Sequence, residues 1–224
     1  MERITPEHID KLFAFTRKHL VEYYDVQLEL VDHLANAIEE RWKENKNLPF
    51  EQVLEQEYKK FGVFGFSSLV EQKQAALQKH YWLIIKNEMR TFFSIPKIFL
   101  SLLLLYSLFR IFTSDWMYIE ELRTGIHLGL VLFTAGIAVY QYWKMDKKRK
   151  WLIQSVGFYL YSLSATLMVW VRPGSSMHLQ NSLILTVFDT VVTGLFVLFL
   201  MVLYFKVIPL LKREVSLTEK RYQF

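Results

Sequence analysis

The chain has 224 residues, of which 52% are hydrophobic and 22% charged, and it carries a formal net charge of +5. Its mean hydropathy of +0.16 is low for a pure transporter and high for a soluble enzyme, so we expect a soluble part joined to a membrane part. The absence of cysteine excludes disulfides, thiolate metal sites and cysteine nucleophiles. Residues 1–93 hold 13 basic and 15 acidic residues, and this acidic excess argues against direct nucleic-acid binding.

The first part of the chain predicts helices and contains no alternating strand pattern. Thr5 and Pro6 suit the N-cap and first position of a helix, which should end near residues 22–24. Asp25 is expected to cap a second helix over residues 26–45. In this second helix an apolar residue recurs at every fourth position, which predicts one buried stripe. The stripe consists of Leu30, Leu34, Ile38 and Trp42.

Two further helices are expected before the membrane part. Pro49 opens a third helix, and Gly62 is placed to end it. The aromatic linker 63–66 should tuck into the core, and Ser67 should cap a last helix that runs on toward Thr91.

The motif formed by Glu29, Asp32-His33-Leu34 and the closing Phe61-Gly62 lies within residues 20–75. This region resembles the HAAS-type helical signalling domain and the related permease-prefix domains. In that family the domain precedes transmembrane helices and is often encoded beside a PadR-like transcriptional repressor. The resemblance therefore implies a cytoplasmic signalling head with a protein partner such as a PadR-like regulator. It implies no catalytic residues and does not cover the membrane part.

Glu29, Asp32 and His33 are the candidate partner-binding residues on this helix. Glu29 and His33 lie four residues apart and therefore on one face, so they could form a metal or proton-sensing site. The alternative, which we favour, is an ordinary intrahelical pair or a histidine that docks a neighbouring helix. A zinc site needs a third ligand and none is apparent, so we expect no metal.

Four apolar runs follow, and each is long enough to predict a membrane span. The loop Lys144–Lys150 holds five basic residues, whereas each expected outer loop holds one. Because cytoplasmic loops carry the excess of Lys and Arg, both termini should be cytoplasmic and the protein should be multi-pass in the inner membrane. The expected spans are residues 95–113, 124–143, 151–171 and 182–205.

The sequence thus predicts an all-α protein in which a cytoplasmic helical domain precedes a four-helix transmembrane bundle. Tyr81, Trp82 and nearby cations suit an interfacial elbow between these two parts, although a plain core helix is almost as good an interpretation. Pro209 should end the last span. The expected parts are the head (1–78), the elbow (79–94), the four spans (95–205) and a basic cytoplasmic tail (206–224).

Polar residues within the spans predict a cluster near the outer leaflet. Asp189 lies about seven residues inside the last span, where an acidic group is costly and should face protein. Arg110, His127 and Arg172 lie at comparable depth, and we expect Asp189 to pair with Arg110. The cluster could be an ion, proton or small-ligand site. The favoured alternative is a structural ion pair, with Arg110 snorkelling outward.

Rows of small residues predict close helix packing in the membrane part. They are more typical of packing within a bundle than of a dimer seam, and a homo-oligomer remains an alternative. One row has Gly125, Gly129 and Gly136, and the other has Thr186, Thr190 and Gly194.

The sequence contains no phosphate-binding loop, nucleotide fingerprint, serine-hydrolase motif or histidine cluster. We therefore expect neither an enzyme nor a bound cofactor. The first hypothesis is a membrane protein of signalling or regulatory type whose head binds a cytoplasmic protein. The second is a small transporter or ion-handling subunit with its site at Asp189, and the third is a structural subunit of a membrane complex.

Overall fold

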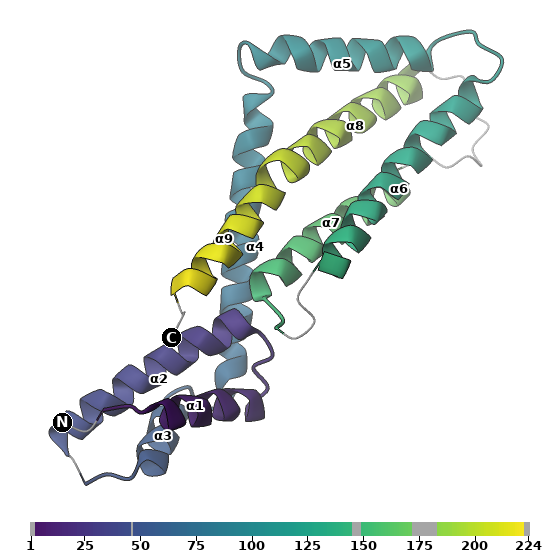
Figure 1. Ribbon diagram of the computed structural model, residues 1–224. Coiled ribbons are helices and arrows are strands. Elements are labelled where there is room, and N and C mark those ends of the chain that lie inside the picture. Colours follow the sequence, from purple (N-terminus) through teal and green to yellow (C-terminus); the bar gives the residue numbers. More distant parts are fainter. Residues whose placement is uncertain (1–2, 46, 145–148, 172–182, 222–224) are drawn as a thin grey trace. The chain divides into compact units, whose positions relative to one another are not determined.

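The structure is a computed structural model that describes residues 3–45, 47–144, 149–171 and 183–221, without the side chains of 161 and 164–171. The described part is helical, and its only extended pairing is an isolated bridge between Tyr23 and Lys150. The all-α prediction is therefore confirmed (Figure 1). The helices are α1 (Pro6–Lys18), α2 (Tyr24–Glu44), α3 (Phe50–Lys59), α4 (Phe66–Thr91), α5 (Lys97–Phe112), α6 (Ile119–Lys144), α7 (Leu152–Val171), α8 (Leu183–Val202), the π-helical turn η1 (Leu203–Val207) and α9 (Ile208–Arg221).

Contacts divide the described residues into two compact units. Unit 1 consists of residues 1–78, 146–155 and 214–224, and unit 2 consists of residues 79–145 and 156–213. The first boundary falls inside α4, between Gln78 and Lys79. Unit 1 therefore contains α1 to α3 together with the segment that leads into α7.

In unit 1, α1 begins as predicted but ends early. Thr5 is the N-cap, its hydroxyl accepts the His8 N–H, and the His8 side chain accepts the Thr5 N–H in return. The helix ends at Lys18 instead of near residues 22–24. The reason is Leu20, whose φ of 63° is left-handed and incompatible with a continuing helix.

The stripe predicted on α2 is confirmed. Leu30, Leu34, Ile38 and Trp42 are all buried, and they belong to one apolar core with residues from α1 and α3. The Trp42 indole N–H donates to the Leu48 carbonyl at 3.0 Å, which satisfies the polar end of this large side chain. The face of α2 that carries the stripe therefore organises the core of unit 1.

The connection from α3 to α4 agrees only partly with expectation. Gly62 has a φ of 75°, which suits the end of a helix. Of the linker predicted to enter the core, Phe66 is buried, but Val63 and Phe64 are exposed. Ser67 lies within the first turn of α4, which begins at Phe66, and is not its N-cap. Its hydroxyl donates back to the Phe64 carbonyl at 2.7 Å, whereas the side chain of an N-cap residue accepts an N–H.

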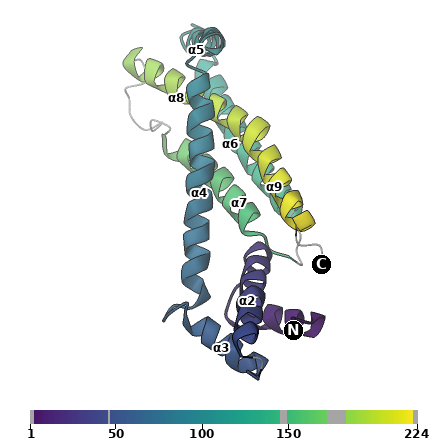
Figure 2. The same ribbon diagram turned by 90° about the vertical axis from the view of Figure 1, so that its left-hand side faces the viewer.

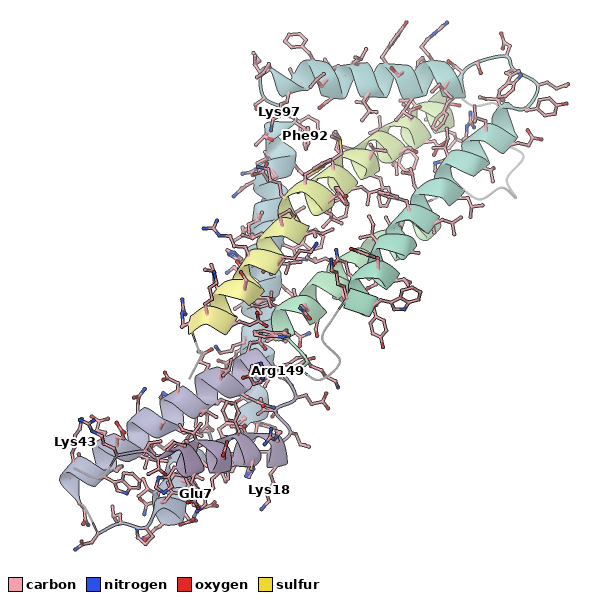
Figure 3. The ribbon with its side chains drawn as sticks, in the orientation of Figure 1. Glu7, Lys18, Lys43, Phe92, Lys97 and Arg149 are labelled. Atoms are coloured by element: carbon pink, nitrogen blue, oxygen red, sulfur yellow. The ribbon has the colours of Figure 1, made fainter. Side chains whose placement is uncertain are left out.

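In unit 2, the chain turns sharply after Thr91 and α5 then runs crosswise to the end of α4 (Figure 2). The Ser101 hydroxyl donates to the Phe92 carbonyl at 2.9 Å, and Lys97 lies over the Phe92 ring (Figure 3). Further along, α5 packs against α8, where a Cβ added to Gly194 would meet the Leu105 side chain. Small residues on α8 thus allow a close helix contact, as predicted for that row.

The row of glycines on α6 behaves differently. A Cβ added to Gly125, Gly129 or Gly136 would meet no heavy atom of the described residues within 4 Å. These glycines therefore do not mark a helix contact within the described part of unit 2.

Pro209, which was expected to end the last span, does not end the helix. After Val202 the chain makes the π-helical turn η1, in which the Ile208 N–H bonds to the Leu203 carbonyl, and α9 then continues to Arg221. Pro209 lacks an N–H and would break the bonding pattern of an α-helix. The wider turn before it accommodates this missing donor, so much of the expected tail is helical.

Two helices of the described chain are long and apolar enough to cross a membrane, Ile119–Lys144 and the continuous helix Leu183–Arg221. They correspond to the expected spans 124–143 and 182–205. The expected span 95–113 corresponds to α5, whose 16 residues reach only about 24 Å at 1.5 Å per residue. The expected span 151–171 corresponds to α7, and the side chains of its second half, residues 164–171, lie outside the described residues.

Candidate functional site

A buried carboxylate in unit 2 is the centre of the candidate site. Asp189 lies on the face of α8 that also carries Thr190, Thr193 and Gly194, and all four residues are buried. An ionised group in such a place requires partners, because burial of an unpaired charge is expensive.

His127 of α6 is the first partner of Asp189. Its Nε2 lies 3.1 Å from Asp189 Oδ1 and 3.0 Å from the Thr193 hydroxyl oxygen. With a proton on Nε2, the imidazole donates to the carboxylate, and the threonine hydroxyl is close enough to share this contact. The sequence placed Asp189 and His127 at similar depth, and the structure brings them together.

Arg123, one helical turn before His127, is the second partner. Its Nε lies 3.8 Å from Asp189 Oδ2, and one terminal nitrogen donates to the Phe112 carbonyl at 2.7 Å. The other terminal nitrogen lies 3.3 Å from a Glu120 carboxylate oxygen. The guanidinium also lies over the Phe112 ring, 5.2 Å from its centroid. Arg123 thus links the last residue of α5 with α6 and α8.

The expected pairing of Asp189 with Arg110 is wrong. Arg110 is exposed, and Arg123 takes the position next to the carboxylate. The physical reason is the orientation of α5. Leu108 and Phe112 are buried on one face of this helix, and Arg110, two positions from each, lies on the opposite face. The Arg110 side chain therefore points outward, as the alternative prediction of a snorkelling arginine had it. Arg172, the fourth predicted member, lies outside the described residues.

Sequence reasoning missed Arg123 and Thr193, although a signal for Arg123 was available. Arg123 and His127 are four residues apart, and the buried Thr134 and Ala138 continue the same face of α6. Four residues likewise separate Asp189 from Thr193 on α8. Each pair therefore occupies one helical face.

The cluster has the properties of a structural anchor. Asp189 is neutralised by a guanidinium and contacts an imidazole, and both partners also bind other groups in unit 2. No group of three or more metal-binding side chains occurs among the described residues.

The head residues singled out from the sequence lie on the outer side of α2. Asp32 and His33 are exposed. The His33 ring lies edge-on to the Phe61 ring, with 6.2 Å between the ring centroids. The expected pair between Glu29 and His33 is replaced by an ion pair between Glu29 and Lys73 of α4. Glu29 and His33 thus make separate contacts on this surface, Glu29 with Lys73 and His33 with Phe61.

A second feature of unit 1 is the junction between the head and the start of α7. The Asp25 carboxylate accepts the Leu152 N–H at 2.9 Å and the Ile153 N–H at 3.3 Å. Asp25 was expected to cap α2, but that helix begins at Tyr24, and its N-cap, Tyr23, makes no side-chain capping bond. Asp25 instead supplies the cap of α7, whose first N–H groups have no partner inside the helix.

Further contacts fix the same junction. The Tyr24 N–H donates to the Lys150 carbonyl at 2.7 Å, and the Lys150 ammonium lies 2.6 Å from a Glu22 carboxylate oxygen. Trp151 and Leu152 are each 1% exposed, and Leu152 belongs to the same core cluster as the α2 stripe. Burial raises the pKa of the Asp25 carboxyl, and the hydrogen bonds from Leu152, Ile153 and Val26 oppose part of this rise.

Comparison of the chain with protein-family models, with curated proteins and with solved structures finds no match.

Proposed function

We propose that this chain is a multi-pass membrane protein of regulatory type, in which a cytoplasmic head binds a protein partner and is coupled to the membrane helices through α7. The single observation that carries the proposal is the burial of the first residues of α7 in the core of the head. The Asp25 carboxylate holds two N–H groups at the start of α7, and Leu152 is part of the apolar core. A shift in the head would therefore move the start of that helix.

The distribution of polarity supports a membrane location for unit 2. Asp189, His127 and Thr193 are buried, whereas large apolar side chains on the same helices are exposed. Soluble proteins show the opposite arrangement. The most hydrophobic windows of the two long helices are only 17% and 44% buried, whereas the core helix of a soluble protein is mostly buried. The exposed apolar side chains on these two helices include Leu128, Leu132, Ile184 and Phe188.

Single cysteines test the proposed topology. The natural chain has no cysteine, so each engineered thiol reports without background. We expect a membrane-impermeant maleimide to label Asp115→Cys, between α5 and α6, in intact cells. Lys43→Cys, in the head, should be labelled only after permeabilisation. Labelling of Lys43→Cys in intact cells, or release of the protein from membranes by alkaline carbonate, would contradict the proposal.

The outward face of α2 is the proposed partner surface. Asp32 and His33 are exposed there beside the ion pair of Glu29 with Lys73. Exposed acidic groups of this kind favour a partner with a basic face. A PadR-like regulator, as the sequence resemblance implies, is the proposed class of partner.

A photo-crosslinking amino acid at His33 tests partner binding in intact cells. Glu7 is the control position, because it is exposed at the start of α1 (Figure 3). We expect a cytoplasmic protein to be crosslinked from position 33 and not from position 7, and Asp32→Lys to remove the product through charge repulsion. Equal products from both positions, or none from position 33, would refute the proposed partner surface.

A further inference from the structure

A cavity of about 640 Å³ opens on unit 1 beside the head–α7 junction. This volume lies within the range of small-molecule sites. Four stretches of the chain form its wall: α1, the connection from α1 to α2, the start of α2 and the segment before α7. The charged residues of the wall are Asp10, Arg17, Glu22, Arg149 and Lys150.

Two cations of this wall have no acidic partner among the residues that the structure describes. Lys150 is neutralised by Glu22, at 2.6 Å. Within the described part of unit 1, neither Arg17 nor Arg149 forms an ion pair, and Asp10 is the one remaining acid of the wall. The cavity therefore presents two guanidinium groups and one carboxylate, which leaves a net positive charge for an anionic ligand to neutralise.

The aromatic residues of the wall position one of these guanidinium groups. The Arg149 guanidinium carbon lies 4.5 Å from the centroid of the Tyr24 ring. The Phe13 ring lies nearly parallel to the Tyr24 ring, with 6.1 Å between centroids. Tyr24 also meets the buried Trp151 edge-on. The Arg149 guanidinium thus lies over an aromatic ring, and its planar set of N–H donors can reach a ligand.

We infer that this cavity binds an organic phosphate that carries hydroxyl groups. A phosphate bears up to two charges and several acceptor oxygens, so it can engage both Arg17 and Arg149, whereas one carboxylate is matched by a single guanidinium. Asp10 is an acceptor for ligand hydroxyl groups. The same chemistry occurs in a phosphoglycerol lipid headgroup and in a soluble phosphate ester.

Occupancy would tie α1 to the segment before α7, because Arg17 and Arg149 come from these two elements. The ligand would thereby strengthen the junction made by Asp25 and Leu152. The inference stands on unit 1 alone and does not require the partner surface on α2.

Glycerol 3-phosphate is the probe of the site. The full chain is reconstituted in nanodiscs of phosphatidylcholine, and binding is measured by calorimetry, with glycerol as the uncharged control. We expect saturable binding of the phosphate ester, and a loss of affinity of about tenfold or more in Arg17→Gln and in Arg149→Gln. Lys18→Gln is the matched control, since Lys18 is an exposed cation at the end of α1 that points away from Arg149 (Figure 3).

A second arm identifies the source of the phosphate. If the ligand is a lipid headgroup, nanodiscs that contain phosphatidylglycerol should raise the melting temperature of the wild type but not of Arg17→Gln, and should compete with glycerol 3-phosphate. If the ligand is soluble, only the free ester should act. Arg17 makes no ion pair with any described residue of unit 1, so Arg17→Gln tests the site even if Arg149→Gln fails to fold. Failure of both probes to bind, or an equal loss in Lys18→Gln, would overturn the inference.

Discussion

Asp189→Ala is expected to destabilise unit 2 by about 3 kcal/mol, because it removes the buried carboxylate beside the Arg123 guanidinium and leaves the half-exposed Glu120 as the remaining acidic neighbour. The Arg123 side chain is only 16% exposed, so water cannot replace the lost partner fully. His127 loses its acceptor in the same step. Denaturant unfolding of the purified protein in detergent measures the change. Asp115→Ala, which removes an exposed acid of the neighbouring loop, is the control and should change stability by less than about 0.5 kcal/mol.

Two further variants separate charge from packing at this cluster. Asp189→Asn keeps the shape and one acceptor oxygen, so its loss of stability should be smaller than that of Asp189→Ala. Combining Asp189→Leu with Arg123→Met removes both charges, and part of the stability should return, as it does when a buried pair is replaced by apolar residues. Unaltered stability in Asp189→Asn and Asp189→Ala alike would remove the structural interpretation of the cluster.

The helical core of the head was predictable because its signal is local and repeated. An apolar residue at every fourth position from Leu30 to Trp42 has one inward face, whatever surrounds the helix. The cap at Thr5 was predictable for the same reason, since its partners lie three residues away.

The contacts that sequence reasoning missed are long-range. Asp25 looks like a local helix cap, yet its hydrogen-bond partners are 127 and 128 residues away, and no rule about neighbouring residues identifies them. Whether Arg110 or Arg123 pairs with Asp189 depends on which face of α5 is turned toward α8. The depth of a residue along a span does not reveal this orientation. Pro209 is a reliable helix breaker only when the preceding turn is α-helical, and here that turn is π-helical.

Trp151→Ala is expected to cost unit 1 about 3–5 kcal/mol, because it removes a fully buried indole and leaves a cavity. Trp151 is 1% exposed and contacts Tyr24, the residue that supports Arg149. Trp143→Ala is the matched control: the same substitution at a side chain that is 75% exposed should cost far less. Trp151→Phe should recover part of the loss, since a phenyl ring fills part of the space.

Hydrogen exchange locates the effect of Trp151→Ala within the chain. The Leu152 and Ile153 amides are held by Asp25, so they should exchange slowly in the wild type and faster once the neighbouring indole is gone. Amides of α8 around Asp189 belong to unit 2 and should keep their protection. If Trp151→Ala and Trp143→Ala lose the same stability, or if Leu152 and Ile153 exchange freely in the wild type, the start of α7 is not part of the core of the head. The coupling through α7 then loses its physical basis, because a helix that is free at its first residues cannot follow a movement of the head.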